Sequence, residues 1–270
     1  MPRVVLVESM KEKNFISLSA DQIKQNLPEE LRSSDIIVYQ SVDSTNARAV
    51  AMGREGAGHG TVLLAEEQTE GRGRNGRSFF SQVGTGLYMS IILRAGQFDP
   101  QLLTIKAAVA VCRAIESVTG ISPQIKWVND LYLGGRKICG ILAEAVASPL
   151  SGNIDFAVLG IGINCSTESF PAELSEKAGS LSATDFSRNV LAAEIIRNLT
   201  DTSLPGGQDL ISEYKSRSLM PGKRVEYSMN GHRYSADVLD FSPDGGLVVR
   251  TSDGEIQTLS SGEVSVKGAV

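Results

Sequence analysis

Apolar positions along the chain follow two periods, and the change from one to the other separates expected strands from expected helices. Apolar runs of the strand type lie at 35–39, 61–65, 86–93 and 154–163. Helical spacing predicts helices over 19–27, over 47–52, and twice within 187–217. Another helix is expected to begin at Asp99-Pro100, with proline in its first position, and to end at Gly120. The pattern is that of a mixed α and β protein.

Two further apolar runs, 124–133 and 136–146, flank the dipeptide Gly134-Gly135. Because two glycines can both take positive φ, this arrangement predicts a β-hairpin. The strand over 154–163 ends in Gly160-Ile161-Gly162-Ile163-Asn164. Its glycines are expected to let a ligand approach the backbone.

The pattern changes from Pro221 onward to short strands around turn signals. These signals are Asn230-Gly231, Pro243-Asp244-Gly245-Gly246 and Asp253-Gly254. Their spacing is typical of a small β-barrel. We therefore predict a first domain over 1–218, which includes a short lead-in over 1–34, and a second domain over 219–270.

Composition and charge narrow the class of protein. A chain of 270 residues with 41% hydrophobic content is globular and can form one large or two smaller domains. Its net charge of −5 provides no overall positive field that would attract nucleic acid or an anionic membrane. Any recognition of phosphate must therefore come from a local group of residues. No apolar run approaches the roughly 20 residues of a membrane span, and the opening residues reach Glu8 too soon for a signal peptide. We expect a cytoplasmic protein with no membrane partner.

The three cysteines are expected to be structural. Cys112, Cys139 and Cys165 are odd in number, far apart, and placed in apolar or strand-like surroundings. Neither a disulfide framework nor a zinc site is indicated.

The most distinctive stretch is Gly71-Arg72-Gly73-Arg74-Asn75-Gly76-Arg77, which lies between two expected strands. Its glycines let the backbone close on a ligand, and its guanidinium groups suit a phosphate or a carboxylate. A flexible surface hairpin with solvated arginines is one alternative, and an Arg-Gly nucleic-acid binder is another. The acidic balance, the single Trp127 and the lack of interleaved aromatic residues argue against nucleic acid.

Other polar clusters stand at expected strand ends or turns, and each has a simple structural explanation when taken alone. Ser44, Thr45 and Asn46 could cap a helix. Asn129-Asp130, which follows Lys126, could be a polar kink. Lys137 could be an exposed lysine on a strand, and Asn164 could end one.

Taken together and in this order, the clusters resemble the motifs of the biotin protein ligases. The matching stretches are Asp43-Ser44-Thr45-Asn46, Gly71 to Arg77, Lys126 to Asp130, Gly135 to Leu142 and Gly160 to Asn164. The resemblance covers roughly residues 20 to 268. Val128 replaces a usual proline, which removes no chemical group, and Phe79 stands where many members have tryptophan.

The resemblance implies a fold and an activity. The fold is an α+β domain with a mixed α/β sheet, like that of class II aminoacyl-tRNA synthetases, followed by an SH3-like barrel. The enzyme would join biotin to ATP as biotinyl-5′-adenylate with loss of pyrophosphate, and then pass biotin to a lysine of a biotin carboxyl carrier domain. Mg²⁺ is expected with ATP because phosphate oxygens need a hard cation. A lipoate-protein ligase is the nearest enzyme alternative, although such enzymes generally lack the Gly-Arg-Gly-Arg loop.

The resemblance also implies roles for individual residues. The catalytic residues would be Lys137, Arg74 and Asp130, and Asp130 would either position Mg²⁺ or receive the proton of the incoming lysine. Biotin would be bound by Ser44, Thr45, Asn46, Gln68, Arg72, Gly73, Arg74 and Lys137. ATP or the adenylate would be bound by Arg74, Arg77, Phe79, Lys126, Asn129 and Asn164. The arginine loop is expected to be mobile in the free protein and ordered with the adenylate.

Many biotin ligases also carry an N-terminal DNA-binding domain. Only about 40 residues precede Asp43, too few for that domain together with the first strand and helix. We therefore predict no DNA partner. The sequence leaves the oligomeric state open, and the resemblance allows a homodimer.

Overall fold

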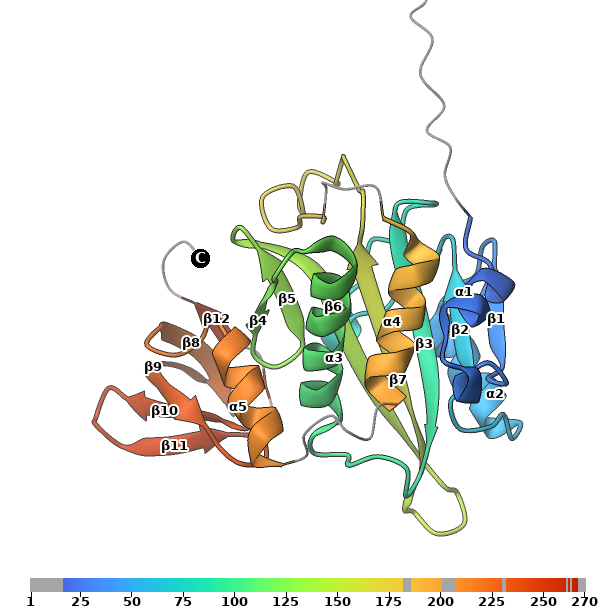
Figure 1. The fold of residues 1–270 in the computed structure, drawn as a ribbon. Coiled ribbons are helices and arrows are strands. Elements are labelled where there is room, and N and C mark those ends of the chain that lie inside the picture. Colours follow the sequence, from blue (N-terminus) through green and yellow to red (C-terminus); the bar gives the residue numbers. More distant parts are fainter. Residues whose placement is uncertain are drawn as a thin grey trace, which may run out of the picture.

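The computed structural model describes residues 17–181, 186–200, 207–229, 232–260, 262 and 264–266. The expected Asn230-Gly231 turn and the first part of the lead-in lie outside these residues. The described chain forms a large mixed sheet with helices on both faces, followed by a smaller antiparallel sheet (Figure 1).

The large sheet has seven strands in the spatial order β1-β2-β3-β7-β6-β5-β4. Strands β1 and β2 are parallel and the other neighbours are antiparallel, which confirms the expected mixed sheet. The strands are β1 (Ile36–Tyr39), β2 (Val62–Ala65), β3 (Gly86–Arg94), β4 (Gln124–Lys126), β5 (Asp130–Leu133), β6 (Arg136–Ala147) and β7 (Ile154–Asn164). Gly134 and Gly135 have φ of 54° and 77°, so the predicted two-glycine hairpin joins β5 to β6.

Alternation along the strands divides the apolar core between the two faces of the sheet. Val62, Leu64 and Leu159 belong to the main core with helices α3 (Leu103–Thr119) and α4 (Arg188–Thr200). Figure 1 shows these two helices side by side across one face, with α1 (Ala20–Asn26) beyond them. Leu63 and Val158 point to the opposite face, where helix α2 (Thr45–Arg54) covers a smaller cluster. The part of this second face that α2 leaves uncovered is where the polar motifs gather.

Two of the sequence predictions about element boundaries are wrong. Helix α3 begins at Leu103, not at Asp99-Pro100, because the Asp99 carboxylate accepts the Gln101 N–H and holds a turn there. The expected strand 124–133 is two strands, because β4 turns over 127–129 and pairs back on β5. Trp127 lies in that turn, buried, and its indole N–H donates to the carbonyl of Gly245 at 2.9 Å. The turn is thus fastened to the smaller sheet.

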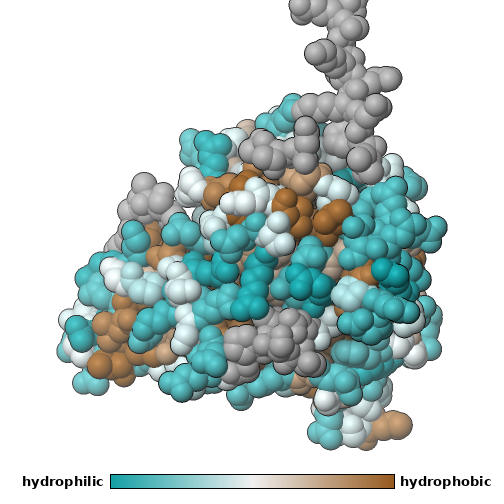
Figure 2. All heavy atoms as spheres, viewed as in Figure 1, coloured by the Kyte–Doolittle hydropathy of each residue, from teal (hydrophilic) through white to brown (hydrophobic). Residues whose placement is uncertain are grey.

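Helix α5 (Gln208–Arg217) leads into the smaller sheet, which has five antiparallel strands in the order β11-β10-β9-β8-β12. The strands are β8 (Arg224–Met229), β9 (His232–Phe241), β10 (Leu247–Thr251), β11 (Ile256–Leu259) and β12 (Val264–Val266). Turns at 242–246 and 252–255 join β9, β10 and β11, as the glycine signals predicted. Figure 2 shows hydrophobic residues over this sheet, amid a largely hydrophilic face of the molecule.

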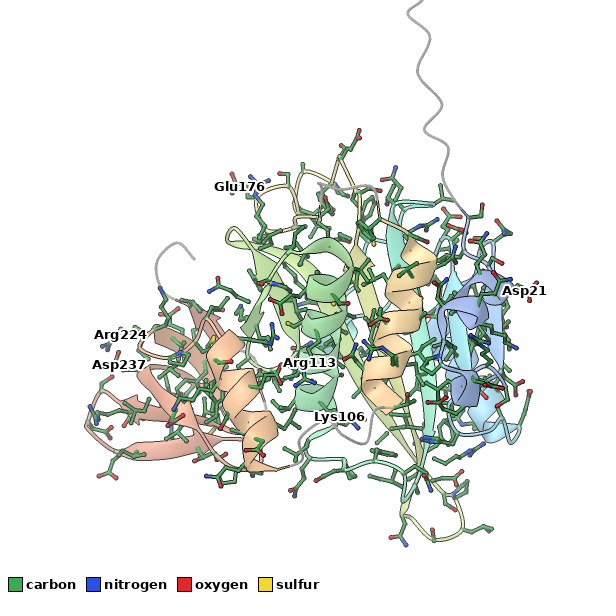
Figure 3. All side chains as sticks on the ribbon, viewed as in Figure 1. Asp21, Lys106, Arg113, Glu176, Arg224 and Asp237 are labelled. Carbon is green, nitrogen blue, oxygen red and sulfur yellow. The ribbon has the colours of Figure 1, made fainter. Side chains whose placement is uncertain are left out.

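The two sheets share one apolar core, and α5 lies between them. The ring of Tyr214 meets that of Phe241 edge-on at 5.2 Å between centroids. On the other side of α5, Glu213 forms an ion pair with Arg113 of α3, which Figure 3 labels beside that helix, and a second with Arg217. The boundary near residue 219 remains a prediction, and the continuous core shows that the two parts are closely packed.

All three cysteines are free and buried. Burial raises the pKa of Cys112 and of Cys165 to about 12, and that of Cys139 well above its ordinary value. Such thiols are unreactive, which agrees with a structural role. Within the described residues, no helix is both long enough and apolar enough to span a membrane.

Candidate active site

One cavity on the second face of the large sheet collects nearly all of the predicted site residues. Its wall includes Ser44, Thr45, Asn46, Gln68, Arg72, Gly73, Arg74, Arg77, Phe79, Lys126, Asn129, Asp130 and Lys137. These residues come from the start of α2, the loop between β2 and β3, the β4–β5 turn and β6. Gly262 and Val264 complete the wall from the C-terminal part of the chain.

The start of α2 supplies the most buried part of the wall. Ser44 is the N-cap, and its hydroxyl accepts the Ala47 N–H at 3.4 Å, so the capping explanation holds for a residue that also lines the cavity. Asp43 accepts the Ser44 N–H at 2.8 Å, and this hydrogen bond lowers the pKa of its carboxyl. The turn before α2 is therefore held by its own side chains.

Gln68 connects this helix end to the loop after β2. Its Oε1 accepts the Thr45 N–H at 2.9 Å and lies 3.0 Å from the Thr45 hydroxyl. Its Nε2 donates to Ser81 Oγ at 2.9 Å, and Ser81 in turn donates to the carbonyl of Phe79 at 3.0 Å. These contacts fix which end of the Gln68 amide faces which neighbour.

A second chain of contacts runs beneath the first. Asn46 is 4% exposed, and its Nδ2 donates to Glu144 Oε2 at 2.7 Å. The Asn46 Oδ1 accepts from Ser90 Oγ at 2.6 Å, and Ser90 Oγ lies 2.8 Å from Thr45 Oγ1. A Cβ added at Gly160 would overlap Asn46 Oδ1, so only glycine leaves room for this amide. Gly160 also lines the cavity, so the expectation that it lets a ligand approach the backbone stays a prediction.

The arginine loop folds back on itself. Phe79 donates its N–H to Gly71 O at 2.8 Å and Gly73 donates to Arg77 O at 2.7 Å, around a turn in which Asn75 has φ of 56°. Arg72 and Arg77 are exposed. The expectation that ligand binding changes the order of this loop remains a prediction.

Arg74 joins the loop to both parts of the molecule. Its Nη1 donates to Asn129 Oδ1 and its Nη2 donates to the carbonyl of Gly262, each at 3.0 Å. Asn129 in turn donates to Ile141 O at 2.7 Å. The guanidinium therefore lies where the β4–β5 turn meets the C-terminal segment.

Lys137 and Asp130 face each other on β6 and β5. The Lys137 Nζ lies 2.6 Å from Asp130 Oδ1, in an ion pair. The Lys137 side chain is 34% exposed, so a negative ligand group can reach it. Lys126 lies nearby with its Nζ 5.7 Å from the centre of the Tyr132 ring.

Phe79 covers the strands at the middle of the cavity. A Cβ at Gly162 would come within 2.7 Å of its ring, and a Cβ at Gly140 within 3.3 Å. Gly162 therefore accommodates an aromatic ring and also lines the cavity, so the expected approach of a ligand to its backbone stays a prediction. The ring leaves a flat apolar surface in the cavity wall.

Asn164 is not among the residues that line the cavity. It is 6% exposed, and its Nδ2 donates to the carbonyl of Gly179 at 2.9 Å. Its side chain thus holds the loop that follows β7, and its assignment to the nucleotide remains a prediction.

Sequence reasoning missed several polar residues that support this wall. Ser81, Ser90 and Glu144 each bond to a predicted site residue, and Gly262 O bonds to Arg74. Ser90 and Glu144 lie within strands, where the alternation of apolar and polar residues is the only pattern in the sequence. That alternation does not indicate a role in the site. Gly262 belongs to no motif, and the packing of the smaller sheet brings its carbonyl to Arg74.

The two ends of the cavity suit different chemical groups. Uncharged amides and hydroxyls at the start of α2 match a neutral ring with its own donors and acceptors. The arginines and lysines at the other end match phosphates and a carboxylate. The described residues contain no group of three or more acidic, histidine or cysteine side chains that could hold a metal alone. Asp130 and Asn129 offer oxygen atoms that suit a cation shared with phosphates.

Comparison with known proteins agrees with both the fold and the site. Residues 38–164 match the Biotin/lipoate A/B protein ligase family, and residues 222–267 match the Biotin protein ligase C terminal domain. The solved biotin protein ligase from Aquifex aeolicus in complex with biotin and ATP superposes with a TM-score of 0.72 at 28% identity, over 86% of this chain and 98% of that one. The fold and the cavity therefore define a ligase domain of the biotin and lipoate class.

Two curated relatives narrow the class further. The Mycobacterium tuberculosis protein named biotin--[acetyl-CoA-carboxylase] ligase is 31% identical over 242 residues, which are 84% of this chain and 87% of that protein. The bifunctional ligase/repressor BirA of Bacillus spizizenii is 41% identical over 170 residues, which are 61% of this chain and 51% of that protein. The chain thus aligns with about half the length of the Bacillus relative. The chain belongs to the biotin protein ligase family.

Proposed function

We propose that the protein activates biotin with ATP to form biotinyl-5′-adenylate and pyrophosphate, and then transfers biotin to a lysine of a carrier protein. The observation that carries this proposal is the convergence of the separate motifs on one cavity with a neutral end and a cationic end. The Aquifex aeolicus neighbour, which was solved with biotin and ATP, supports the same pair of substrates.

The neutral end is suited to the fused rings of biotin. A ureido group offers two N–H donors and one carbonyl acceptor, and Ser44, Thr45 and Gln68 present complementary hydroxyl and amide groups. Because Gln68 and Thr45 already hold each other, little side-chain entropy remains to be lost when the ring binds. Arg72 and Gly73 lie beside these residues and are assigned to biotin with Asn46.

The cationic end is suited to bringing two anions together. The biotin carboxylate must approach the α-phosphate of ATP, and their repulsion must be offset by fixed positive charge. Lys137 and Arg74 are assigned this role, with Arg77 and Lys126 as further cations. Phe79 and Asn129 complete the nucleotide wall, and Asn164 is assigned to it by its motif position.

Magnesium is the expected metal, and the donor set is compatible with it. Asp130 supplies a buried carboxylate oxygen that lies beside the Lys137 ammonium, and a single protein carboxylate with substrate phosphates is a common Mg²⁺ arrangement. When bound, the ion would neutralise phosphate charge. Lys137, whose Nζ lies 2.6 Å from Asp130 Oδ1, is assigned to the biotin carboxylate and the α-phosphate.

The acceptor of biotin is proposed to be the carrier domain of a biotin-dependent carboxylase. The names of the Mycobacterium tuberculosis and Paracoccus denitrificans relatives, both biotin--[acetyl-CoA-carboxylase] ligases, support a carboxylase as the recipient. The entering lysine must lose a proton, and Asp130 is the carboxylate at the reacting end of the cavity.

A coupled assay of pyrophosphate release tests the first step without a carrier. The protein should release pyrophosphate with ATP and biotin, and release far less with ATP and lipoate. Adding an apo carrier domain should then yield one biotin per carrier, measured by mass. Equal release with lipoate would favour the lipoate alternative, and no release with either acid would contradict the proposal.

We further propose that this chain acts in the cytoplasm and does not bind DNA. Its net charge of −5 supports the absence of DNA binding. The anisotropy of labelled duplex DNA should stay unchanged when the protein is added at low salt. A rise in anisotropy that weakens steeply with added salt would show DNA binding and contradict this proposal. A homodimer is compatible with the family, and light scattering with and without adenylate would reveal one.

A further inference from the structure

A partly buried carboxylate behind the cavity has no part in the proposed chemistry. Glu144 lies on β6 and does not line the cavity, yet its Oε2 accepts the Asn46 Nδ2 donor at 2.7 Å. We infer that Glu144 is a positioning residue that fixes the orientation of the Asn46 amide and, through it, the hydroxyl protons of the biotin site. This inference depends on the proposed binding of biotin at that end of the cavity.

Glu144 determines the direction of the Asn46 amide. A carboxylate is an acceptor only, so it can pair with the Nδ2 of Asn46 and repels its Oδ1. The amide has no room to move aside, because its Oδ1 occupies the space left by the missing Cβ of Gly160. Glu144 therefore holds Oδ1 toward Ser90.

The direction of the Asn46 amide in turn fixes the hydroxyl protons of Ser90 and Thr45. Ser90 has a single proton, and Asn46 Oδ1 at 2.6 Å is an acceptor only, so the Ser90 proton points to Asn46. The 2.8 Å contact between Ser90 and Thr45 must then be made by the Thr45 proton. Gln68 Oε1, at 3.0 Å from Thr45 Oγ1, competes for that proton. With its proton directed to Ser90, Thr45 keeps both lone pairs available to a ligand N–H.

Replacing the Glu144 carboxylate by a neutral amide would remove this control. A neutral amide at position 144 can face Asn46 with either its oxygen or its nitrogen, so the Asn46 amide can turn over. The turned amide would donate to Ser90, and Ser90 would then donate to Thr45 Oγ1. One of the two lone pairs that face the ligand would be occupied. The fraction of protein competent to bind biotin falls, and the apparent affinity falls with it.

The sheet register explains why these groups meet. Ser90 of β3 is opposite Gly160 of β7, and Gly160 is opposite Leu142 of β6. Glu144 is two residues beyond Leu142, so its side chain leaves the same face of the sheet. The start of α2 packs over this point and delivers Asn46. Three strands and one helix therefore place one amide between a carboxylate and a hydroxyl.

The test is a comparison of Glu144→Gln with the wild type and with Asp155→Asn. Asp155 is an exposed carboxylate on the neighbouring strand, where it pairs with Arg94 at 3.5 Å, so its change is chemically matched and leaves the hydrogen bond between Asn46 and Glu144 in place. Biotin binding without ATP is measured by calorimetry, and steady-state kinetics give kcat and the two KM values. Thermal unfolding checks that each variant is folded.

We expect Glu144→Gln to raise the biotin Kd and the KM for biotin about threefold to tenfold, with kcat at saturating biotin and the KM for ATP unchanged. A charge-assisted hydrogen bond is roughly twice as strong as a neutral one, so the effect is moderate. Asp155→Asn should change none of these values. Biotin binding by the wild type tests the proposed function separately, since its absence would refute that function.

A double-mutant cycle distinguishes positioning from general support. In an Asn46→Ala background, Glu144→Gln should change the biotin Kd by less than twofold, because the amide through which it acts is gone. An unchanged Kd in the single Glu144→Gln variant would overturn the inference. So would an equal loss in both backgrounds, or a parallel loss of ATP affinity and unfolding temperature.

Discussion

The two ends of the cavity differ in how far they are organised without a ligand. At the neutral end, Thr45, Asn46 and Ser90 are buried, and each bonds to another side chain. At the cationic end, Arg77 is exposed on a loop. The difference separates recognition, which uses a rigid preformed surface, from reaction, which uses charges able to change partners.

The physical reason lies in the ligand groups that each end meets. A neutral ring gains little from charge, so its affinity depends on donors and acceptors that are already aligned. Arginines and lysines crowded together repel each other until an anion arrives. Lys137 illustrates this, since its Nζ lies 2.6 Å from Asp130 Oδ1 and must turn toward the substrate to act. The comparison predicts different responses to mutation at the two ends.

The largest expected effect is at the cationic end. Lys137→Ala should lower the rate of adenylate formation at least 100-fold, because a charge placed at a developing negative charge stabilises the transition state by about 3 kcal/mol. The unfolding temperature should change little, since the lysine is partly exposed. Pyrophosphate release with biotin and ATP measures the rate, and the exposed Lys223→Ala is the control. A wild-type rate in Lys137→Ala would remove the assignment.

Two glycines on one strand allow the ends to be disturbed separately. Gly160→Ala would displace the Asn46 amide, and Gly162→Ala would displace the Phe79 ring. We expect about a tenfold loss of biotin affinity in the first variant. In the second, we expect a severalfold rise in the KM for ATP with a smaller change for biotin. Calorimetry and kinetics measure the two, and the same profile in both variants would mean that the ends are not distinct.

The strands, the helices and the Gly134-Gly135 hairpin could be predicted because their signals are local. The start of α3 and the break between β4 and β5 could not be predicted. They depend on a side-chain hydrogen bond at Asp99 and on the burial of Trp127 against the smaller sheet. The pattern of residues near these positions does not show where the smaller sheet packs.

The residues of the site likewise fall into those that the sequence could predict and those that it could not. Residues within contiguous motifs, such as Gln68 and Lys137, could be named from the sequence and do line the cavity. The supporting residues Ser90 and Glu144 could not, because each stands alone in its strand and becomes relevant only through register. Both glycines of the Gly-x-Gly stretch were expected at the site and do line the cavity, but the sequence does not show that Asn46 and Phe79 lie over them.

The smallest expected effect lies outside the cavity and serves as a reference for it. The hydrogen bond from Arg113 is the main cause that lowers the pKa of Glu213 in the folded protein. Stability from this pair is therefore fully present above the ordinary glutamate pKa of about 4.3 and is lost as pH falls through the lowered value. Glu213→Gln should cost about 1 kcal/mol of unfolding free energy at pH 7.

Urea unfolding across pH measures this cost. The difference between wild type and Glu213→Gln should shrink as pH falls below about 4. The KM for biotin should be unchanged, which would show that lost stability alone does not reproduce the effects of the glycine variants. A difference that grows toward acid would contradict the assigned direction of the pKa.

Amide hydrogen exchange measured by mass spectrometry tests the central comparison most directly. The free protein, the biotin complex and a complex with a non-hydrolysable biotinyl-adenylate analogue are compared over 71–79 and over the start of α2. We predict that exchange over 71–79 slows more than tenfold with the analogue and less with biotin alone, while the start of α2 is already protected in the free protein. Equal exchange over 71–79 in all three states, or an equal gain in protection over both segments, would contradict the account.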